Sequence, residues 1–184
     1  MDDSDARASA LEVADQLFTA HGVKSVGMDD VRDASGVSLK RLYRLYSSKE
    51  RLAEEALDRS GQAFLAELRA YIEQRKSPEE KLLAVFDFLG RGFTEPDYCG
   101  CPFIRAYDEM SMESPAVVAA VDRQKRALRD FLAELVVEAG KPPALADQLS
   151  IVANGAMVTA AILDGTGAAA DARAAAGALI GAAG

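Results

Sequence analysis

Tryptophan is absent from this sequence of 184 residues, histidine occurs once and cysteine twice. Two cysteines do not make a disulfide framework in a chain of this length. A zinc site uses about four ligands, and the only histidine, His21, is far along the chain from Cys99 and Cys101. One histidine also leaves little material for a Ser/His/Asp triad. We therefore expect neither an enzyme nor a bound metal or other cofactor.

Long apolar runs are missing as well. A membrane-spanning helix needs about 20 mainly apolar residues, and no such run occurs. The first ten residues, MDDSDARASA, are acidic and polar, whereas a secretory signal starts with positive charge. We therefore expect a cytoplasmic, soluble protein without a membrane span. Its hydrophobic content of 49% is enough for a core in one large domain or two small ones.

No segment alternates with period two for long enough to predict a strand, while helical signals recur along the chain. The sequence therefore predicts an all-α fold of about nine helices, with a small unit at residues 1–48 joined to a larger bundle at 49–184. Capping residues and breakers set the ends. The expected helices lie at about 5–21, 28–35, 39–45, 49–76, 78–93, 102–110, 115–139, 144–164 and 168–182.

A basic segment, GVSLKRLYRLYSSKERL (residues 36–52), stands out in a chain of net charge −8. Lys40 and Arg44 form an i, i+4 pair of like charge, which costs a helix about 0.2–0.5 kcal/mol, so helix stability does not explain them. An anionic partner would explain them, and an ordinary solvated face is the alternative. On a helical projection, Lys40, Arg41 and Arg44 lie opposite Leu39, Leu42, Tyr43 and Tyr46.

The turn before this basic helix is short and contains glycine: Ser35-Gly36-Val37-Ser38. Two short helices joined by such a turn are typical of the helix-turn-helix motif, whose second helix enters the major groove of DNA. Ser38 is the expected cap of the second helix. The sequence therefore predicts binding to double-stranded DNA.

Residues 10–57 resemble the DNA-binding domain of the TetR/AcrR family of bacterial transcriptional regulators. The similarity rests on the segments ALEVADQLFTAHG, MDDVRDASGVS and LKRLYRLYSSKERL. A later segment, GCPFIRAYDEMSMESPAVVAAVDRQKRALRDFLAEL, is similar to one ligand-binding branch of the family. The resemblance implies a helix-turn-helix DNA-binding domain at 1–48 and a ligand-binding and dimerisation domain at 49–184.

The resemblance also implies roles in DNA binding for individual residues. Lys40, Arg41 and Arg44 are expected at base edges, where arginine prefers guanine, and Leu39 at a thymine methyl group. The expected phosphate contacts, which position the helix without reading sequence, come from Ser38, Tyr43 and Lys49.

A small-molecule effector and a homodimer formed by the last two helices follow from the same resemblance. Small residues at Gly155, Ala156, Ala160 and Ala161 would permit close approach of these helices. Asn154 could serve a ligand or a dimer contact. The candidate pocket residues, each of which could equally be core, are Leu89, Phe93, Phe103, Tyr107, Met110, Asn154 and Met157.

Two alternatives stay open at this point. Cys99 and Cys101 are expected to be reduced thiols, and a metal site or a thiol sensor are the alternative interpretations.

The predicted function is that of a repressor that a small molecule releases from a palindromic operator. The alternative function is a helical ligand-binding or adaptor protein whose DNA-binding unit is degenerate.

Overall fold

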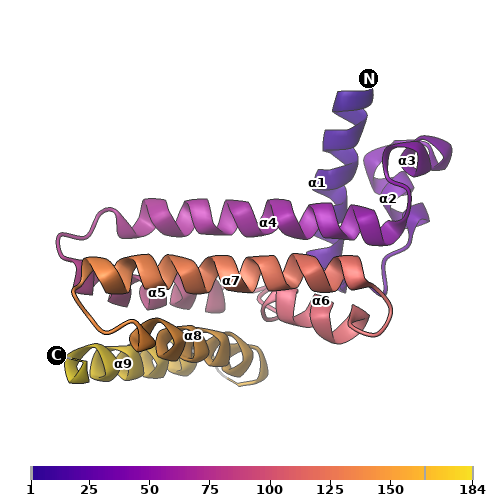
Figure 1. Cartoon of the computed structure of the whole chain (residues 1–184). Helices are drawn as coiled ribbons and strands as arrows, with labels where there is room; N and C mark the ends of the chain where they lie inside the picture. Colours follow the sequence, from indigo (N-terminus) through magenta and orange to yellow (C-terminus); the bar gives the residue numbers. More distant parts are fainter. Residues whose placement is uncertain (1, 164, 184) are drawn as a thin grey trace. The chain divides into compact units, whose positions relative to one another are not determined.

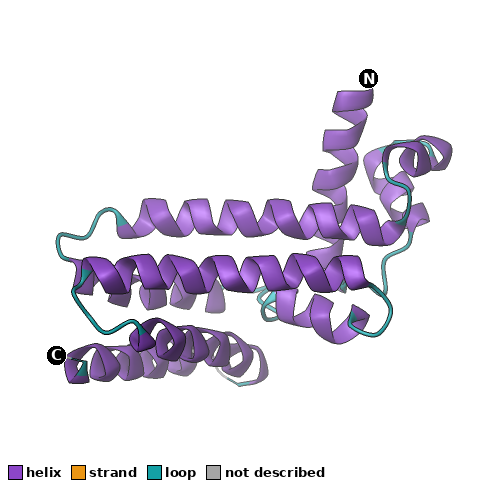
Figure 2. Ribbon diagram, viewed as in Figure 1, coloured by secondary structure: helices purple, strands orange, loops and turns teal. Residues whose placement is uncertain are grey.

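The structure is a computed structural model that describes residues 2–163 and 165–183. Within these residues the chain is all-α, with nine helices and no strand (Figure 2), which confirms the predicted fold class. In chain order, as labelled in Figure 1, the helices are α1 (Asp3–His21), α2 (Met28–Ser35), α3 (Leu39–Leu45), α4 (Lys49–Ile72), α5 (Pro78–Phe93), α6 (Pro102–Met110), α7 (Pro115–Glu138), α8 (Ala144–Ile162) and α9 (Gly165–Ala182).

Capping chemistry sets the helix ends. The predicted start of α5 is confirmed, because the Glu80 N–H donates to Ser77 Oγ at 3.2 Å and the Ser77 N–H donates to Glu80 Oε2 at 3.3 Å. The first helix was expected to begin at about residue 5, after Ser4 as its cap. Instead Asp2 and Asp5 form the capping box, so α1 begins at Asp3.

Ser38 is the N-cap residue of α3, as predicted, but its side chain makes no hydrogen bond to the start of the helix. Two other helix ends differ from the predictions. The helix expected to run to about residue 76 ends at Ile72, and the last helix begins at Gly165 instead of 168. Residue 164, the predicted end of the eighth helix, lies outside the described residues.

The chain divides into two compact units. The first unit consists of Met1–Ala63 and Pro102–Gln124, and the second of Phe64–Cys101 and Lys125–Gly184. The first unit therefore contains the whole predicted DNA-binding domain together with the start of α4, all of α6 and the start of α7. The predicted functional boundary at residue 48 does not coincide with this division by compactness, and it stays a prediction.

In the first unit, α1 packs against α2 and α3. Its buried face carries small residues, with Phe18 near its end. The helix α3 has only seven residues, and isolated helices shorter than about 12 residues are marginal in water. It is therefore held by burial of Leu42 and of the adjoining Tyr46, which are 0% and 1% exposed.

In the second unit, α9 packs against both α5 and α8 around an apolar core. Among the described helices, α8 alone is long and apolar enough, by length and composition, to cross a membrane, and part of it is buried in this core. Its exposed side carries Ile151, Val158 and Ile162, which recur at i, i+7 and i+11 and so form one stripe.

The loop between α1 and α2 is held by α6. Gly22 has φ +85°, and a Cβ added there would lie 2.1 Å from Glu109 Oε1. The Glu109 carboxylate accepts the Lys24 N–H at 3.0 Å and the Arg105 Nε–H at 2.9 Å. The backbone conformation thus favours glycine, and an added Cβ would also displace the Glu109 side chain.

Gly22→Ala should lower the free energy of unfolding by roughly 1–3 kcal/mol through backbone strain. Displacing Glu109 from the Lys24 N–H should cost about 1 kcal/mol more. Gly36→Ala is the matched control, because Gly36 has φ +69° and an added Cβ meets nothing within 4 Å. Urea denaturation of both variants measures the difference. Gly22 has ψ 154° and lies outside the left-handed helical region of Gly36, so Gly22→Ala should lose more stability for this reason as well. A loss equal to or smaller than that of Gly36→Ala would contradict this account.

Candidate nucleic-acid interface

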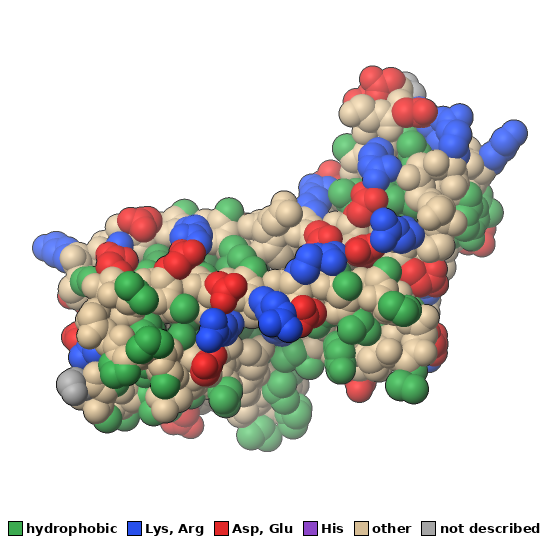
Figure 3. Space-filling model, viewed as in Figure 1, with side chains coloured by type: hydrophobic (Ala, Val, Ile, Leu, Met, Phe, Trp, Pro, Cys, Tyr) green, Lys and Arg blue, Asp and Glu red, His purple; other side chains and the backbone are tan. Residues whose placement is uncertain are grey.

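The outer face of α3 carries Lys40, Arg41 and Arg44, because its opposite face is buried against the rest of the first unit. Lys40 is exposed, and the side chains of Arg41 and Arg44 are 24% and 63% exposed. In the space-filling view, basic side chains gather over the region of α3 and lie next to acidic ones at the start of α1 (Figure 3). The projection made from the sequence thus placed these three cations on one side.

Contacts of Arg7 and Tyr46 hold α3 against α1. The Tyr46 hydroxyl donates to the Arg7 carbonyl at 2.9 Å, and the Arg7 guanidinium lies 4.5 Å from the centroid of the Tyr46 ring. Arg7 Nη1 also donates to the carbonyl of Leu45, the last residue of α3, at 2.9 Å. Burial raises the pKa of Tyr46 above its ordinary value, so this hydroxyl stays a donor at neutral pH.

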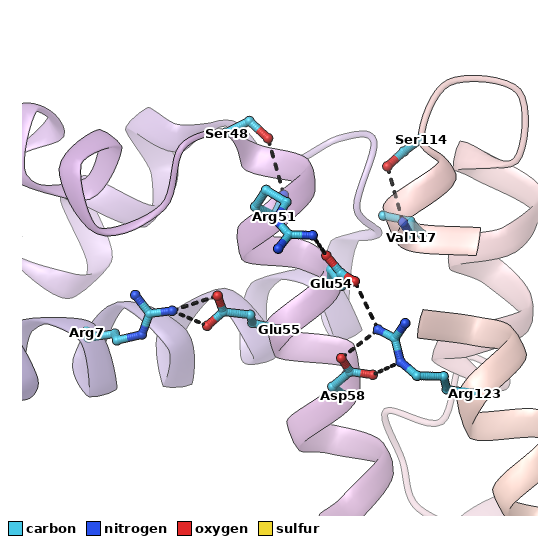
Figure 4. A network of polar contacts seen from close by, with 9 residues as sticks. All are labelled: Arg7, Ser48, Arg51, Glu54, Glu55, Asp58, Ser114, Val117 and Arg123. Carbon is cyan, nitrogen blue, oxygen red and sulfur yellow. Dashed lines mark hydrogen bonds and ion pairs between the residues drawn. The ribbon is translucent and has the colours of Figure 1, made fainter. Parts of the chain in front are cut away.

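Ion pairs connect α4 to helices on either side within the first unit (Figure 4). Arg7 Nη2 donates to both carboxylate oxygens of Glu55 at 2.6 Å. Arg123 of α7 binds Asp58 at 2.7 Å and Glu54 at 3.1 Å, and these acids raise its pKa. The start of α4 is therefore bound by side chains to both α1 and α7.

A single carboxylate of α1 binds two of the exposed arginines. Arg41 donates to Asp3 Oδ1 from Nε at 2.9 Å and from Nη2 at 2.6 Å. Arg44 Nη2 donates to Oδ1 at 2.7 Å and to Oδ2 at 2.9 Å. The hydrogen bond from Arg41 and the charge of Arg44 lower the pKa of Asp3. No local pattern indicates this partner, because Asp3 lies 38 residues from Arg41 along the chain.

The other predicted DNA contacts on α3 differ in exposure. Ser38 is exposed and Tyr43 is 50% exposed, so both hydroxyls are accessible. Leu39 is half-buried. Tyr43 was placed on the apolar stripe by projection, but it lies at the edge of that stripe and leaves the core to Leu42 and Tyr46.

Lys49 contacts the loop between α1 and α2, a role that the sequence did not predict. Its Nζ donates to the carbonyls of Val23 at 2.8 Å, Val26 at 2.9 Å and Lys24 at 3.3 Å. An ammonium group has three N–H donors, and all three are used here. Lys49 thus positions the loop in this structure, and its contact with phosphate stays a prediction.

The predicted ligand residues divide between the two units. Phe103 and Met110 are buried in the first unit, where Tyr107 is 52% exposed. Leu89, Phe93 and Met157 are buried in the core of the second unit. A groove of about 440 Å³ opens between α8 and α9, and none of the seven predicted ligand residues lines it.

Asn154 has partners inside the second unit. Its Oδ1 accepts from Lys125 Nζ at 2.7 Å, and its Nδ2 donates to the Ser150 carbonyl at 2.8 Å. Lys125 Nζ also lies 3.4 Å from Cys101 Sγ, a contact that the sequence did not suggest. Both cysteines are thiols, and in the described part of the chain no group of three or more His, Cys, Asp or Glu could hold a metal.

Comparisons with known proteins agree with this arrangement. Residues 10–56 match the model of "Bacterial regulatory proteins, tetR family". The chain is 28% identical over 165 residues to the HTH-type transcriptional repressor ComR of Escherichia coli, covering 84% of this chain and 79% of that protein. It is 28% identical over 134 residues to the HTH-type transcriptional activator FasR of Mycolicibacterium smegmatis, covering 71% and 58%.

A solved structure is similar over almost the whole length. The crystal structure of a TetR-family transcriptional regulator from Streptomyces coelicolor matches with a TM-score of 0.88 and 26% identity, covering 98% of this chain and 96% of that one. The similarity therefore extends well beyond the helix-turn-helix.

The contacts of Lys49 predict that Lys49→Ala lowers the free energy of unfolding by about 1–3 kcal/mol, because three loop carbonyls lose a charged donor. The salt dependence of DNA binding should scarcely change. Lys40→Ala is the control: its side chain is exposed, so stability should hold while the slope of log K against log salt concentration falls by about 0.9. If Lys49→Ala instead lowers that slope and leaves stability unchanged, Lys49 binds phosphate.

Proposed function

We propose that this chain, which belongs to the TetR family of bacterial regulatory proteins, represses transcription from a palindromic operator and is released from it by a small molecule. It is a DNA-binding transcriptional regulator, as the family match and the full-length structural similarity indicate. Proteins of this family are generally regulators and not enzymes. We assign the protein to the cytoplasm.

The observation that carries the proposal is the basic outer face of α3 on an ordered helix-turn-helix. A short helix presented in this way fits the major groove of DNA. Arg44 is more exposed than Arg41, so it is the best candidate for a bidentate contact with guanine. Lys40 and Arg41 lie beside it on the same helix. Ser38 and Tyr43 can donate hydroxyl groups to phosphate, and Leu39 is placed to contact a thymine methyl group.

This geometry favours a regulator over an adaptor protein with a degenerate DNA-binding unit. In a degenerate unit, nothing would maintain a basic helix face or the turn before it. Here Gly36 ends α2 in a left-handed conformation, φ +69°, and its N–H donates to the Arg32 carbonyl at 2.9 Å. The turn thus keeps the geometry that a helix-turn-helix needs.

A dimer is part of the proposal, because one helix of seven residues buries too little surface for specific binding. The exposed apolar stripe of Ile151, Val158 and Ile162 on α8 supports pairing through the last two helices. Apolar side chains that gather on a protein surface often mark a contact with another protein. Gly155 and Ala161 are exposed on the same helix, whereas Ala156 and Ala160 are buried in the chain's own bundle. Those two alanines therefore allow close packing of helices within one protomer.

The effector part of the proposal rests on the family and on the apolar side chains of both units. An effector would act by changing the separation of the two α3 helices in the dimer, which couples two distinct sites. The coupling starts in the unit that binds the effector. The candidate residues are Phe103, Tyr107 and Met110 in the first unit and Leu89, Phe93 and Met157 in the second.

Arg44→Ala tests the DNA-binding part of the proposal. On an operator selected from random duplexes it should cost about 1–3 kcal/mol of binding free energy and relax the preference at one position in each half-site. Stability should hold, because the side chain is 63% exposed and such ion pairs contribute little.

The readouts for this variant are operator binding, melting temperature and transcription from a promoter that carries the operator. Wild-type protein should reduce transcription, and Arg44→Ala should restore it. Equal losses of affinity for operator and random DNA would make Arg44 a phosphate contact. Increased transcription with wild-type protein would contradict repression.

Ile151→Asp and Ile162→Asp test the dimer. Each places a charge on the exposed stripe of α8, and burial of an unpaired charge in an interface costs several kcal/mol. Light scattering should report a monomer, with much weaker operator binding. Val137→Asp on α7 is the control, because Val137 is an apolar side chain that is also 70% exposed. A dimer that survives both α8 substitutions would place the interface elsewhere.

A further inference from the structure

The start of α1 brings an acidic side chain to the face that is expected to meet DNA. The Asp3 carboxylate accepts four hydrogen bonds at 2.6–2.9 Å from the guanidinium groups of Arg41 and Arg44. Its side chain is 57% exposed, so the contact lies at the surface. A carboxylate in this place repels the phosphates of DNA and so opposes DNA binding.

Asp3 is not needed to begin α1. The capping box of that helix is formed by Asp2 and Asp5: the Asp5 N–H donates to Asp2 Oδ1 at 2.9 Å, and the Asp2 N–H donates to Asp5 Oδ2 at 3.4 Å. Surface ion pairs between exposed side chains also contribute little to stability. Asp3 lies in the first turn of α1, where a negative charge favours the helix dipole, but that effect does not require its contacts with Arg41 and Arg44.

We propose that Asp3 determines DNA specificity by competing with DNA phosphate for Arg41 and Arg44, so that it weakens binding to random DNA more than binding to the operator. This inference rests on the proposed function. The carboxylate and a phosphate group present the same kind of acceptor to a guanidinium, with two oxygens that accept parallel N–H bonds.

The competition differs between the two kinds of DNA. Random DNA is bound almost entirely through phosphates, so an arginine that leaves Asp3 exchanges one anionic acceptor for another and gains little. On the operator, Arg44 exchanges the carboxylate for a base edge, whose bidentate contact discriminates between sequences. Breaking the Asp3–Arg44 pair costs the same on either DNA, so the difference in the effect of Asp3 comes from Arg41. On the operator Arg41 stays on Asp3, whereas on random DNA Asp3 keeps Arg41 from a phosphate group.

The two arginines are unequally held, which indicates how the exchange proceeds. Arg41 uses both Nε and Nη2 on one oxygen of Asp3, and its side chain is 24% exposed. Arg44 uses Nη2 alone, and its side chain is 63% exposed. Arg44 is thus the first to be released toward DNA, while Asp3 can stay with Arg41.

Asp3→Asn removes the charge and keeps the size of the side chain. The matched control is Glu12→Gln, which removes one negative charge at an exposed position of the same helix, away from the capping box. Binding of a fluorescent operator duplex and of a random duplex of equal length is measured by anisotropy over a range of KCl concentrations, with melting temperature as the check on folding.

Asp3→Asn should tighten binding to the random duplex by about two- to fivefold, the range that one exposed ion pair supports. The slope of log K against log KCl concentration should steepen by about 0.9, because one more arginine reaches phosphate. Operator affinity should change by a smaller factor, so the ratio of operator to random affinity falls. Glu12→Gln should leave slope and ratio unchanged.

Two results would overturn the inference. If Asp3→Asn behaves as Glu12→Gln does, its effect is one of net charge alone. If Asp3→Asn weakens operator binding and leaves random binding unchanged, Asp3 orients the arginines instead of competing for them. Failure of the proposed function looks different, because the wild-type protein would then bind neither duplex with sequence preference.

Discussion

The stacking of the Arg7 guanidinium on the buried ring of Tyr46 is the contact on which the DNA-binding face depends. A helix as short as α3 does not hold its conformation in water by itself. Arg7 stacks at 4.5 Å on Tyr46, donates to the Leu45 carbonyl at the end of α3, and pairs with Glu55 of α4. One side chain thereby satisfies the end of the short helix and fixes it to two neighbours.

Because the inner face of α3 is occupied by Leu42 and Tyr46, its cations can lie only outside. The rest of the chain is acidic, and Asp3 lies directly against two of those cations. A protein of net charge −8 is repelled by DNA except where its basic face docks. Overall charge and the Asp3 contact therefore act in the same direction: both weaken binding that depends on phosphate alone.

The sequence predicted local structure well and long-range contacts poorly. The start of the helix 78–93 was predicted correctly, because Ser77 and Glu80 form a capping box that can be read within four residues. The sequence placed the three cations of α3 together for a similar reason, since helical periodicity is local. The pairing of Asp3 with Arg41, and of Lys49 with the loop carbonyls, joins residues more than twenty positions apart, which no local pattern records.

The central claim is that α3, held by Arg7 and Tyr46, reads a sequence as one half of a symmetric pair. Selection of bound duplexes from a random pool, followed by sequencing, tests it most directly. The account predicts enrichment of an inverted repeat with a guanine at a fixed position in each half-site. Enrichment of sequences without two-fold symmetry, or no enrichment over the starting pool, would contradict it.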